Sequence, residues 1–332
     1  MTLREAESDD PISIRPMRQM FTSAIVLDQP HDIGLRDVEL TPAGPADVTV
    51  DVAWSGISTG TEKLFFDGTM PPFPGMGYPL VPGYESVGQV VEAGPDSGFS
   101  AGDTVFVPGA NCYQGARGLF GATAAKVVLP GARAIRVADA LGQDAVLLSL
   151  AATAHHALTL RDATPPELIV GFGVLGRLIA RIAIALGHPA PRVWERNPAR
   201  RDTTEAVEVV DRADDARKDY GAIMDVSGDA TILDTLVARL ARGGTITLAG
   251  FYAAPLSFSF PPAFMREARL LIAAEFTPAD LTSVTGLVDS GRLSLGGLIS
   301  HRADAGDAPN AYATAFGDPH CTKMILDWRR NG

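Results

Sequence analysis

The chain has 332 residues, a formal net charge of −11 and a hydrophobic fraction of 46%. This length allows two domains with separate cores, whereas the acidic balance argues against a nucleic acid partner, because phosphate backbones bind basic faces. No apolar run reaches the roughly 20 residues of a transmembrane segment. Residues 1–20 are polar and mixed in charge, and Cys112 and Cys321 are the only cysteines. We therefore expect a cytoplasmic protein with a loose N-terminal extension.

The first part of the chain, up to about residue 140, alternates short apolar runs with turns rich in glycine and proline. Its runs predict strands at residues 21–27, 47–54, 86–92 and 103–107. Many short strands with few helices are typical of a barrel-like β domain. Residues 70–79 contain too much proline and glycine for a regular element, so we expect a loop there.

From about residue 145 the pattern changes to alternating helices and strands. Helices are predicted at residues 145–160, 175–186 and 232–241, and strands at residues 168–171, 192–195, 222–226, 245–249 and 270–274. This alternation is typical of a parallel sheet with helices on both faces. The stretch after about residue 287 does not continue it, so we assign that stretch to the first domain.

A glycine-rich turn, Gly171-Phe-Gly-Val-Leu-Gly176, lies between an apolar strand and a helix. That context makes it a dinucleotide-binding turn. Gly171 allows the tight turn, Gly173 lets the backbone approach the pyrophosphate, and Gly176 permits close packing of helix on strand. Val174 and Leu175 open the helix, whose free N–H groups and partial positive charge favour phosphate.

Glu195 ends the second predicted strand, about 20 residues after the turn, where the dinucleotide fingerprint has an acidic residue. Its carboxylate can accept hydrogen bonds from the adenosine ribose and would repel a 2′-phosphate, which favours NAD over NADP. The alternative is that Glu195 is only an exposed loop charge. The arginines that follow keep NADP open, because they can hold a 2′-phosphate. The remaining cofactor-site candidates are Arg196 in that loop, and Ser227 and Gly250 after later strands.

The β-rich first domain, the central dinucleotide unit and the C-terminal return together resemble the medium-chain dehydrogenase/reductase superfamily. The resemblance covers nearly the whole chain after about residue 20. It implies an α/β fold with a GroES-like β-barrel catalytic domain (residues 21–148 and 286–332) and a Rossmann domain with a doubly wound parallel sheet (residues 149–285). It also implies an active site in the cleft between them and a homodimer through the Rossmann sheet edge, with residues 256–260 as the candidate pairing strand.

Zinc-dependent members of this superfamily bind zinc through a cysteine, a histidine and a further cysteine or acidic residue. The corresponding positions here are Ser58, Tyr84 and Ser149. Neutral hydroxyl groups are poor zinc ligands compared with thiolate, imidazole or carboxylate. The four-cysteine structural lobe is absent too, since only Cys112 lies in its region. We therefore predict that the protein binds no zinc.

Some strings resemble one family within the superfamily, the bacteriochlorophyllide a dehydrogenases. They lie at residues 54–63, 70–85, 150–158 and 249–258. The proline, methionine and glycine loop in the second string is unlike the equivalent in most relatives. The family oxidises the 3-(1-hydroxyethyl) group of a bacteriochlorophyllide to 3-acetyl, with NAD+ accepting the hydride. The resemblance thus implies NAD as cofactor and a tetrapyrrole substrate that carries its own magnesium.

Oxidation of a secondary alcohol without zinc needs a side chain or an ordered water to take the hydroxyl proton. The candidates are His155, His156, Tyr84 and Glu85 as proton acceptors, with Ser58 and Thr61 orienting the alcohol oxygen. Adjacent residues of a helix point about 100° apart, so at most one histidine is expected to face the cleft. Tyr84 has the alternative of only filling the former zinc pocket, and Glu85 that of tying down a loop or contacting the cofactor.

A flat, mostly apolar macrocycle needs a broad apolar cleft, and methionine and aromatic side chains adapt well to such a ring. The predicted substrate-binding residues are Met70, Phe73, Met76 and Tyr78. Phe65 and Phe66 precede the loop and are expected to belong to a local core instead. The loop glycines suggest a lid.

Two other functions remain open at this stage. A zinc-free quinone or enone reductase of the same superfamily would share every cofactor feature, and a non-catalytic NAD- or pigment-binding protein would share the fold. The residues do not decide whether the protein contacts a membrane surface peripherally.

Overall fold

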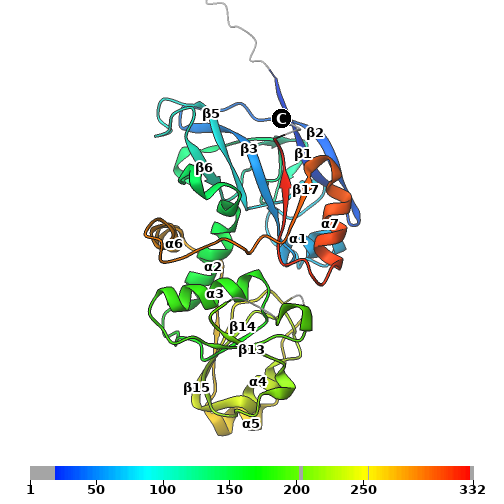
Figure 1. The fold of residues 1–332 in the computed structure, drawn as a ribbon. Helices are drawn as coiled ribbons and strands as arrows, with labels where there is room; N and C mark the ends of the chain where they lie inside the picture. Colours follow the sequence, from blue (N-terminus) through cyan, green and yellow to red (C-terminus); the bar gives the residue numbers. More distant parts are fainter. Residues whose placement is uncertain (1–18, 202–204, 253, 330–332) are drawn as a thin grey trace, which may run out of the picture.

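The computed structural model describes residues 19–201, 205–252 and 254–329. The chain forms two lobes, a β lobe and a nucleotide lobe, joined by helices (Figure 1). Most of the predicted extension, residues 1–20, lies outside the described residues, and Met20 already begins the first strand. Among the helices of the described part, none has the length and apolar character required to cross a membrane.

The β lobe is built on two sheets. The first has the order β7-β2-β1-β4-β8 and consists of β1 (Met20–Gln29), β2 (Asp32–Leu40), β4 (Leu80–Val81), β7 (Tyr113–Gln114) and β8 (Arg117–Gly118). The second has the order β10-β6-β5-β3-β18-β17, with β9 also on β3, and consists of β3 (Asp47–Ile57), β5 (Ser86–Ala93), β6 (Thr104–Val107), β9 (Lys126–Pro130), β10 (Ile135–Arg136), β17 (His301–Asp304) and β18 (Met324–Asp327). Valine, leucine and alanine side chains from both sheets share one buried core.

The end of the chain returns to the β lobe. Strand β18 pairs antiparallel with β3, so that Met324 lies opposite Ile57. Helices α1 (Thr61–Asp67) and α7 (Ala308–Gly317) lie beside the sheets of this lobe (Figure 1). The exact domain boundaries after residues 148 and 285 stay predictions, and helix α6 (Pro278–Asp289) runs across the second of them.

The nucleotide lobe has one parallel sheet in the order β13-β12-β11-β14-β15-β16. Its strands are β11 (Leu168–Val170), β12 (Arg192–Trp194), β13 (Glu208–Val210), β14 (Tyr220–Asp225), β15 (Leu240–Leu248) and β16 (Arg269–Ile272). In sequence order this is 3-2-1-4-5-6, the arrangement of a Rossmann domain, in which ligands bind beyond the carboxyl ends of the strands at the switch between the two halves.

Helices cover both faces of this sheet, as the alternating pattern predicts. Because successive side chains of a strand point to opposite faces, Ile169 lies in the core that includes α3 (Val174–Ala185), while Leu168 and Val170 lie in the core that includes α4 (Leu233–Arg239). Helix α5 (Phe260–Arg266) contributes Ala263 to the second core.

The two lobes meet at helix α2 (Leu148–Thr159), which packs against both α3 and α6. The predicted helix at residues 145–160 therefore exists, but its first residues belong to a 3₁₀ segment, Asp139–Leu147. The apolar side chains of this region form one core that also takes in Phe106 and Val87 of the β lobe.

The expected pairing strand at residues 256–260 is wrong. Residues 254–259 form no strand, and Phe260 begins α5 with prolines in its first turn. Proline there fixes a helical φ and lacks the N–H that a strand ladder needs. The strand at this edge of the sheet is β16 instead.

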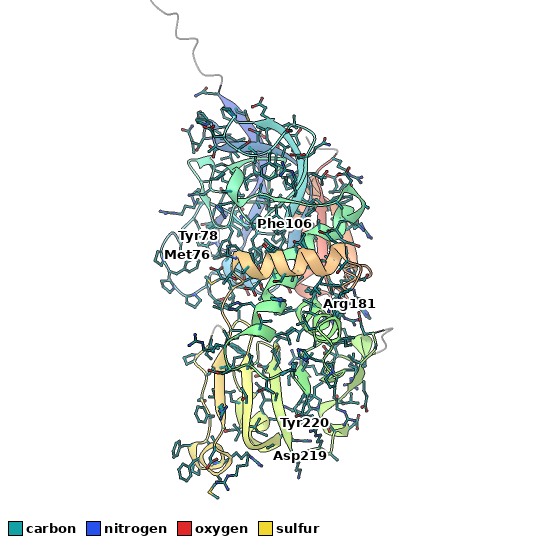
Figure 2. The ribbon with its side chains drawn as sticks, turned by 90° about the vertical axis from the view of Figure 1, so that its left-hand side faces the viewer. Met76, Tyr78, Phe106, Arg181, Asp219 and Tyr220 are labelled. Atoms are coloured by element: carbon teal, nitrogen blue, oxygen red, sulfur yellow. The ribbon has the colours of Figure 1, made fainter. Side chains whose placement is uncertain are left out.

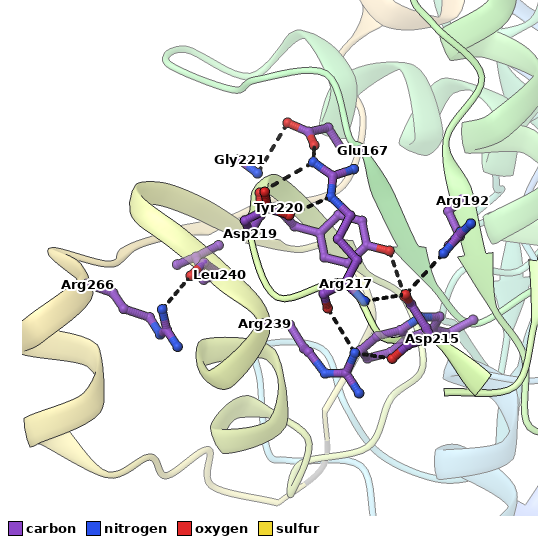
Figure 3. A network of polar contacts seen from close by, with 11 residues as sticks. Glu167, Arg192, Asp215, Arg217, Asp219, Tyr220, Gly221, Arg239, Leu240 and Arg266 are labelled. Carbon is purple, nitrogen blue, oxygen red and sulfur yellow. Dashed lines mark hydrogen bonds and ion pairs between the residues drawn. The ribbon is translucent and has the colours of Figure 1, made fainter. Parts of the chain in front are cut away.

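A buried carboxylate, Asp215, holds the amino ends of the central strands together (Figure 3). It is 2% exposed and accepts hydrogen bonds from Arg192, from Trp194 Nε1 at 2.7 Å and from Tyr220 Oη at 2.6 Å. Burial raises the pKa of Asp215, but these hydrogen bonds outweigh it and hold the pKa below its usual value. Arg217 N donates to it as well, at 3.0 Å. Loss of this carboxylate would leave Trp194 Nε1 and Tyr220 Oη without their acceptor, whereas Arg192 would keep its contact with Glu208.

We predict that Asp215→Ala lowers the free energy of unfolding by roughly 3 kcal/mol, because buried polar partners are left unpaired. Asp219→Asn is the matched control, since Asp219 is 79% exposed and pairs with Arg217 at the surface. That change is expected to cost less than about 1 kcal/mol. Urea unfolding of both variants measures the two free energies of unfolding. Equal losses would contradict the role of Asp215 in holding the strand ends together.

Candidate active site

The glycine turn has the geometry that a bound pyrophosphate needs. Gly171 has φ +99°, and a Cβ there would meet the backbone of Ser227 at 3.2 Å. A Cβ on Gly176 would lie 2.0 Å from the Gly171 carbonyl oxygen, so only glycine fits. By contrast, a Cβ on Gly173 would meet no atom within 4 Å, and Gly173 caps α3. Two glycines thus close the turn, while the third leaves open space at a helix N-terminus, as a dinucleotide site requires.

Glu195 follows β12, and its carboxylate is fixed by the backbone. It is 6% exposed and accepts hydrogen bonds from Phe172 N at 2.9 Å and Asn197 N at 2.8 Å. The alternative that it is an exposed loop charge is therefore wrong. Arg196 beside it is exposed. The side chain of Glu195 thus joins the glycine turn to the loop that follows β12.

Two further predicted positions lie after β14 and β15. Ser227 N donates to Asp225 Oδ1 at 3.1 Å, and Gly250 N donates to the Asp225 carbonyl at 3.1 Å. Burial raises the pKa of Asp225, whose carboxyl group also accepts a hydrogen bond from Tyr252. Since β14 neighbours β11, the structure brings Ser227 to the glycine turn, in keeping with a shared cofactor site.

The three positions that resemblance aligns with zinc ligands come together in the structure. Ser58 Oγ and Tyr84 Oη share a hydrogen bond of 2.6 Å, and Ser149 Oγ donates to the Tyr84 carbonyl oxygen at 2.7 Å. Tyr84 Oη also donates to Thr61 Oγ1 at 3.4 Å. Burial raises the pKa of Tyr84 well above its usual value, and nearby Glu85 raises it further. The tyrosine therefore stays a neutral phenol at physiological pH.

These side chains do not fit a zinc ion. Neutral hydroxyl groups bind zinc poorly, and a phenol with a raised pKa does not supply a phenolate in their place. Within the described ranges, no three histidine, cysteine, aspartate or glutamate side chains are grouped so that they could hold a metal.

Glu85 is paired with a residue near the end of the chain. Lys323 Nζ forms an ion pair with Glu85 and donates to the Ile57 carbonyl oxygen at 3.0 Å. Both side chains are 1% exposed. A Cβ on Gly56 would lie 2.2 Å from Glu85 Oε2 and 2.9 Å from Lys323 Cε, so this position must be glycine. The Glu85–Lys323 ion pair is adjacent to the Ser58–Tyr84 hydroxyl pair, because Ile57 precedes Ser58 and Glu85 follows Tyr84.

His155 and His156 contact the same carboxylate, although adjacent residues of a helix point about 100° apart. Their Nδ1 atoms lie 2.8 Å and 2.9 Å from the two oxygens of Asp280. Asp280 also completes the capping box of α6 with Thr277. Burial raises the pKa of Asp280, but the hydrogen bonds from Thr277 and from both rings outweigh burial and hold the pKa below its usual range. Asp280 is 6% exposed and lies at the start of α6, which packs against α2. One carboxylate can contact both rings because each of its oxygens meets one of them.

The predicted loop is irregular, as expected, and packs on α1. Phe65 is fully buried, and Met70 and Phe73 contact its cluster. The Phe65 and Phe73 rings lie 6.3 Å apart. Tyr78 Oη donates to the Phe65 carbonyl oxygen. Figure 2 shows Met76 and Tyr78 at one side of the β lobe, near its lower end. The local core around Phe65 is confirmed, and the substrate role of the loop stays a prediction.

Known proteins identify the chain. The alcohol dehydrogenase GroES-like domain family matches residues 44–139. A protein of Cereibacter sphaeroides named 2-desacetyl-2-hydroxyethyl bacteriochlorophyllide A dehydrogenase is 55% identical over 315 residues, which cover 93% of this chain and 99% of that protein. The chain belongs to the bacteriochlorophyllide dehydrogenase family. It is accordingly an enzyme, an alcohol dehydrogenase of the medium-chain superfamily.

Solved structures confirm the expected fold of this dehydrogenase. An alcohol dehydrogenase from Escherichia coli complexed with NADH has a TM-score of 0.77 at 18% identity and covers 92% of this chain and 99% of its own. A dehydrogenase from Sinorhizobium meliloti bound to NADP has a TM-score of 0.76 at 20% identity, with 93% and 100% covered. The GroES-like lobe and the Rossmann lobe are thereby established, whereas the choice of nucleotide is not.

One residue of the dehydrogenase site was missed from the sequence. Glu62 in α1 is 1% exposed; its Oε1 accepts from Ser58 N at 3.1 Å and its Oε2 from Tyr312 Oη at 2.6 Å. Burial raises its pKa to about 7. In the sequence, an acidic residue three positions after Thr59 is as typical of an exposed capping residue at a helix start as of a buried acid. Only the tertiary contact with Tyr312 distinguishes these two interpretations of Glu62.

Glu62 predicts a pH dependence of stability. Because its folded pKa lies above that of an unfolded glutamate, its stabilising contribution is present at low pH and is lost as the pH rises through about 7. Between about pH 5 and about pH 7.5 the wild type should lose up to about 1.4 kcal/mol per pH unit relative to Glu62→Gln, which stays neutral. Urea unfolding at both pH values measures this. Parallel losses in the two proteins would show that Glu62 does not titrate in this range.

Proposed function

We propose that this dehydrogenase oxidises the 3-(1-hydroxyethyl) group of a bacteriochlorophyllide to 3-acetyl, with NAD+ as hydride acceptor and without zinc. The observation that carries the proposal is the 55% identity, over nearly the full length of both chains, to a protein named for the hydroxyethyl bacteriochlorophyllide. The hydroxyl cluster around Tyr84 supports it, because an alcohol oxygen needs hydrogen-bonding groups at the position where zinc acts in other members.

The chain's own residues divide the chemistry between them. The oxidation removes a hydride from the carbinol carbon and a proton from its hydroxyl, and NAD+ supplies the hydride acceptor when bound. Ser58 and Tyr84 hold the alcohol oxygen by hydrogen bonds, with Thr61 beside them. Since the phenol stays protonated, Tyr84 orients the alcohol and does not take its proton as a phenolate.

The proton leaves by way of a histidine in this proposal. Asp280 holds Nδ1 of both rings, which leaves each Nε2 without a partner among the described residues. A carboxylate that accepts a hydrogen bond from Nδ1 in this way fixes the tautomer and the orientation of an imidazole. His156 is favoured over His155, because Ser149, Thr153 and His156 follow the spacing of one helix face. Two helical turns, about 10 Å, separate Ser149 from His156, so ordered water must complete the path.

NAD is favoured over NADP by the surroundings of Glu195. In the dinucleotide fingerprint the acidic residue at this position binds the ribose hydroxyl groups, so the buried carboxylate of Glu195 would repel a 2′-phosphate. Two of the three nearby arginines are already engaged: Arg200 donates to the carbonyl oxygens of Pro319 and Cys321, and Arg201 to Glu195 O and Asp211. That leaves Arg196 as the exposed cation of this loop.

Two properties of the assembly complete the proposal. The edge strand β16 carries exposed Leu270 and Ile272, and Phe260, Phe264 and Met265 of α5 are also largely exposed. Such an apolar patch at an open sheet edge is suited to pairing with a second copy, so we infer a homodimer. The free, buried Cys112 and Cys321 fit a reducing compartment, which favours the cytoplasm.

The activity is tested by adding NAD+ to the purified enzyme with the hydroxyethyl pigment and recording absorbance. A red shift from acetyl conjugation, with NADH formed in equal amount, is the expected result. Ser58→Ala should lower kcat by roughly 10-fold or more, because a hydrogen bond to the reacting oxygen is lost. Ser283→Ala, an exposed serine of α6, serves as the control. Reduction of an enone or quinone with no oxidation of the alcohol would favour the reductase alternative, and tight pigment binding with no turnover the non-catalytic one.

Nucleotide preference is tested by kinetics with NAD+ and NADP+. We expect the wild type to favour NAD+ by roughly 10-fold or more, and Glu195→Gln to narrow that preference because the repelling charge is removed. Arg196→Ala should weaken NADP+ use further and leave NAD+ use nearly unchanged. A wild type that prefers NADP+ would overturn the cofactor assignment.

A further inference from the structure

Arg117 is an exposed cation beside the loop at residues 70–79, and its guanidinium has no hydrogen-bond or ion-pair partner among the described residues. Several other cations of this lobe are engaged, for example Lys63 with Asp67 and Lys126 with Asp51. In a chain with a net charge of −11, carboxylates are plentiful, so an unpaired guanidinium here is available to a ligand.

The loop is shaped around this arginine. Strand β8 pairs with β4, and Arg117 N donates to the Pro79 carbonyl oxygen at 2.9 Å. A Cβ on Gly77 would lie 2.6 Å from Arg117 Nε and 3.2 Å from its Cδ. The side chain therefore lies directly against the loop, and a glycine at position 77 leaves the room for it.

The same short segment reaches the hydroxyl pair. Leu119 packs in the apolar cluster of Phe65 and Met70, and the ring of Phe120 meets the ring of Tyr84 edge-on at 5.3 Å between centroids. Three residues of chain span no more than about 10 Å, so Arg117 lies within about that distance of Phe120. Phe120 beside Tyr84, Leu119 in the loop cluster and Arg117 against the loop thus lie on one short segment, with the cation at its far end from Tyr84.

We propose that Arg117 binds the propionate carboxylate of the tetrapyrrole and so selects the free acid over esterified pigments. This inference rests on the proposed function, since a chlorophyllide is a macrocycle with one free carboxylic acid. The acid and the hydroxyethyl group sit on different rings of the macrocycle, so a carboxylate site must lie away from the reacting carbon, as Arg117 does. A guanidinium suits this task because its planar fork binds a carboxylate through two parallel hydrogen bonds.

Arg133 also lacks a side-chain partner among the residues that the structure describes, and it provides the matched comparison. It is exposed, and its Nη2 lies 3.4 Å from where a Cβ of Gly109 would be. That places it next to the main chain of Phe120 and not on the loop. A charge effect that depends on the loop should follow Arg117 alone.

The experiment compares the free acid of the hydroxyethyl pigment with its methyl ester in the wild type, Arg117→Gln, Arg117→Lys and Arg133→Gln. We expect the wild type to have a KM for the acid roughly 10-fold below that for the ester, the difference that one charge-assisted contact supplies. Arg117→Gln should raise the KM for the acid to that for the ester, with kcat and the KM for the ester unchanged. Arg117→Lys should keep part of the preference, and Arg133→Gln all of it.

A preference that survives in Arg117→Gln, or that is lost in Arg133→Gln, would overturn the proposal. Equal effects of Arg117→Gln on acid and ester would also overturn it, because they would show a packing role. If the wild type oxidises neither compound, the proposed function fails separately. Fluorescence titration of the acid and the ester then tests Arg117 by binding alone, with the same expected ratios.

Discussion

Lys323 and Glu85 meet where water hardly reaches, and the candidate site is arranged around that contact. Removing two charges from water costs several kcal/mol, so such a pair persists only when its geometry and added hydrogen bonds repay the loss. Lys323 meets this condition by also donating to the carbonyl oxygen of Ile57. Ile57 precedes Ser58, and Glu85 follows Tyr84. One ammonium group therefore fixes the end of β3, which Ser58 follows, and the segment before β5, which contains Tyr84. It also fixes the returning chain end just before β18.

Hydroxyl groups that do not fit a zinc ion must be held in place by other contacts, and the buried acids serve this purpose. Glu62 binds the backbone of Ser58 from α1 and reaches Tyr312 of α7, while Glu85 is neutralised by Lys323. Two buried carboxylates with a single lysine favour a protonated Glu62, in keeping with its raised pKa. The hydroxyl pair therefore lies in surroundings that keep it neutral. Such a pair can orient an alcohol and donate or accept hydrogen bonds, but it cannot acidify the alcohol as zinc does.

How far the sequence alone leads depends on the range of each interaction. The position of the glycine turn between a strand and a helix, and of Glu195 after the next strand, could be predicted because their spacing is local. Their role in binding the cofactor stays a prediction. The alternation of strands and helices predicted the doubly wound sheet for the same reason. Contacts between distant residues were not predictable: Glu85 and Lys323 are 238 residues apart, and His155 and Asp280 are 125 apart. Periodicity shows which face of an element is buried, but it does not show which partner covers that face. The joint binding of both histidines by Asp280, and the role of Glu62, therefore required the structure.

The segment before β18 also connects the two ends of the candidate site. Asn197 and Arg200, in the loop after Glu195, donate to the carbonyl oxygens of Pro319 and Cys321. Lys323 follows two residues later and reaches Glu85 behind Tyr84. A short stretch of backbone thus touches the predicted ribose loop at one end and the floor of the hydroxyl pair at the other. Hydride transfer depends on the distance between the carbinol carbon and the nicotinamide, and a displacement of about 1 Å can cost 100-fold in rate. In zinc-dependent relatives the metal fixes the alcohol. In this protein the side chains around Ser58 and Tyr84 do not fit a zinc ion, and this stretch of backbone connects them with the loop after Glu195.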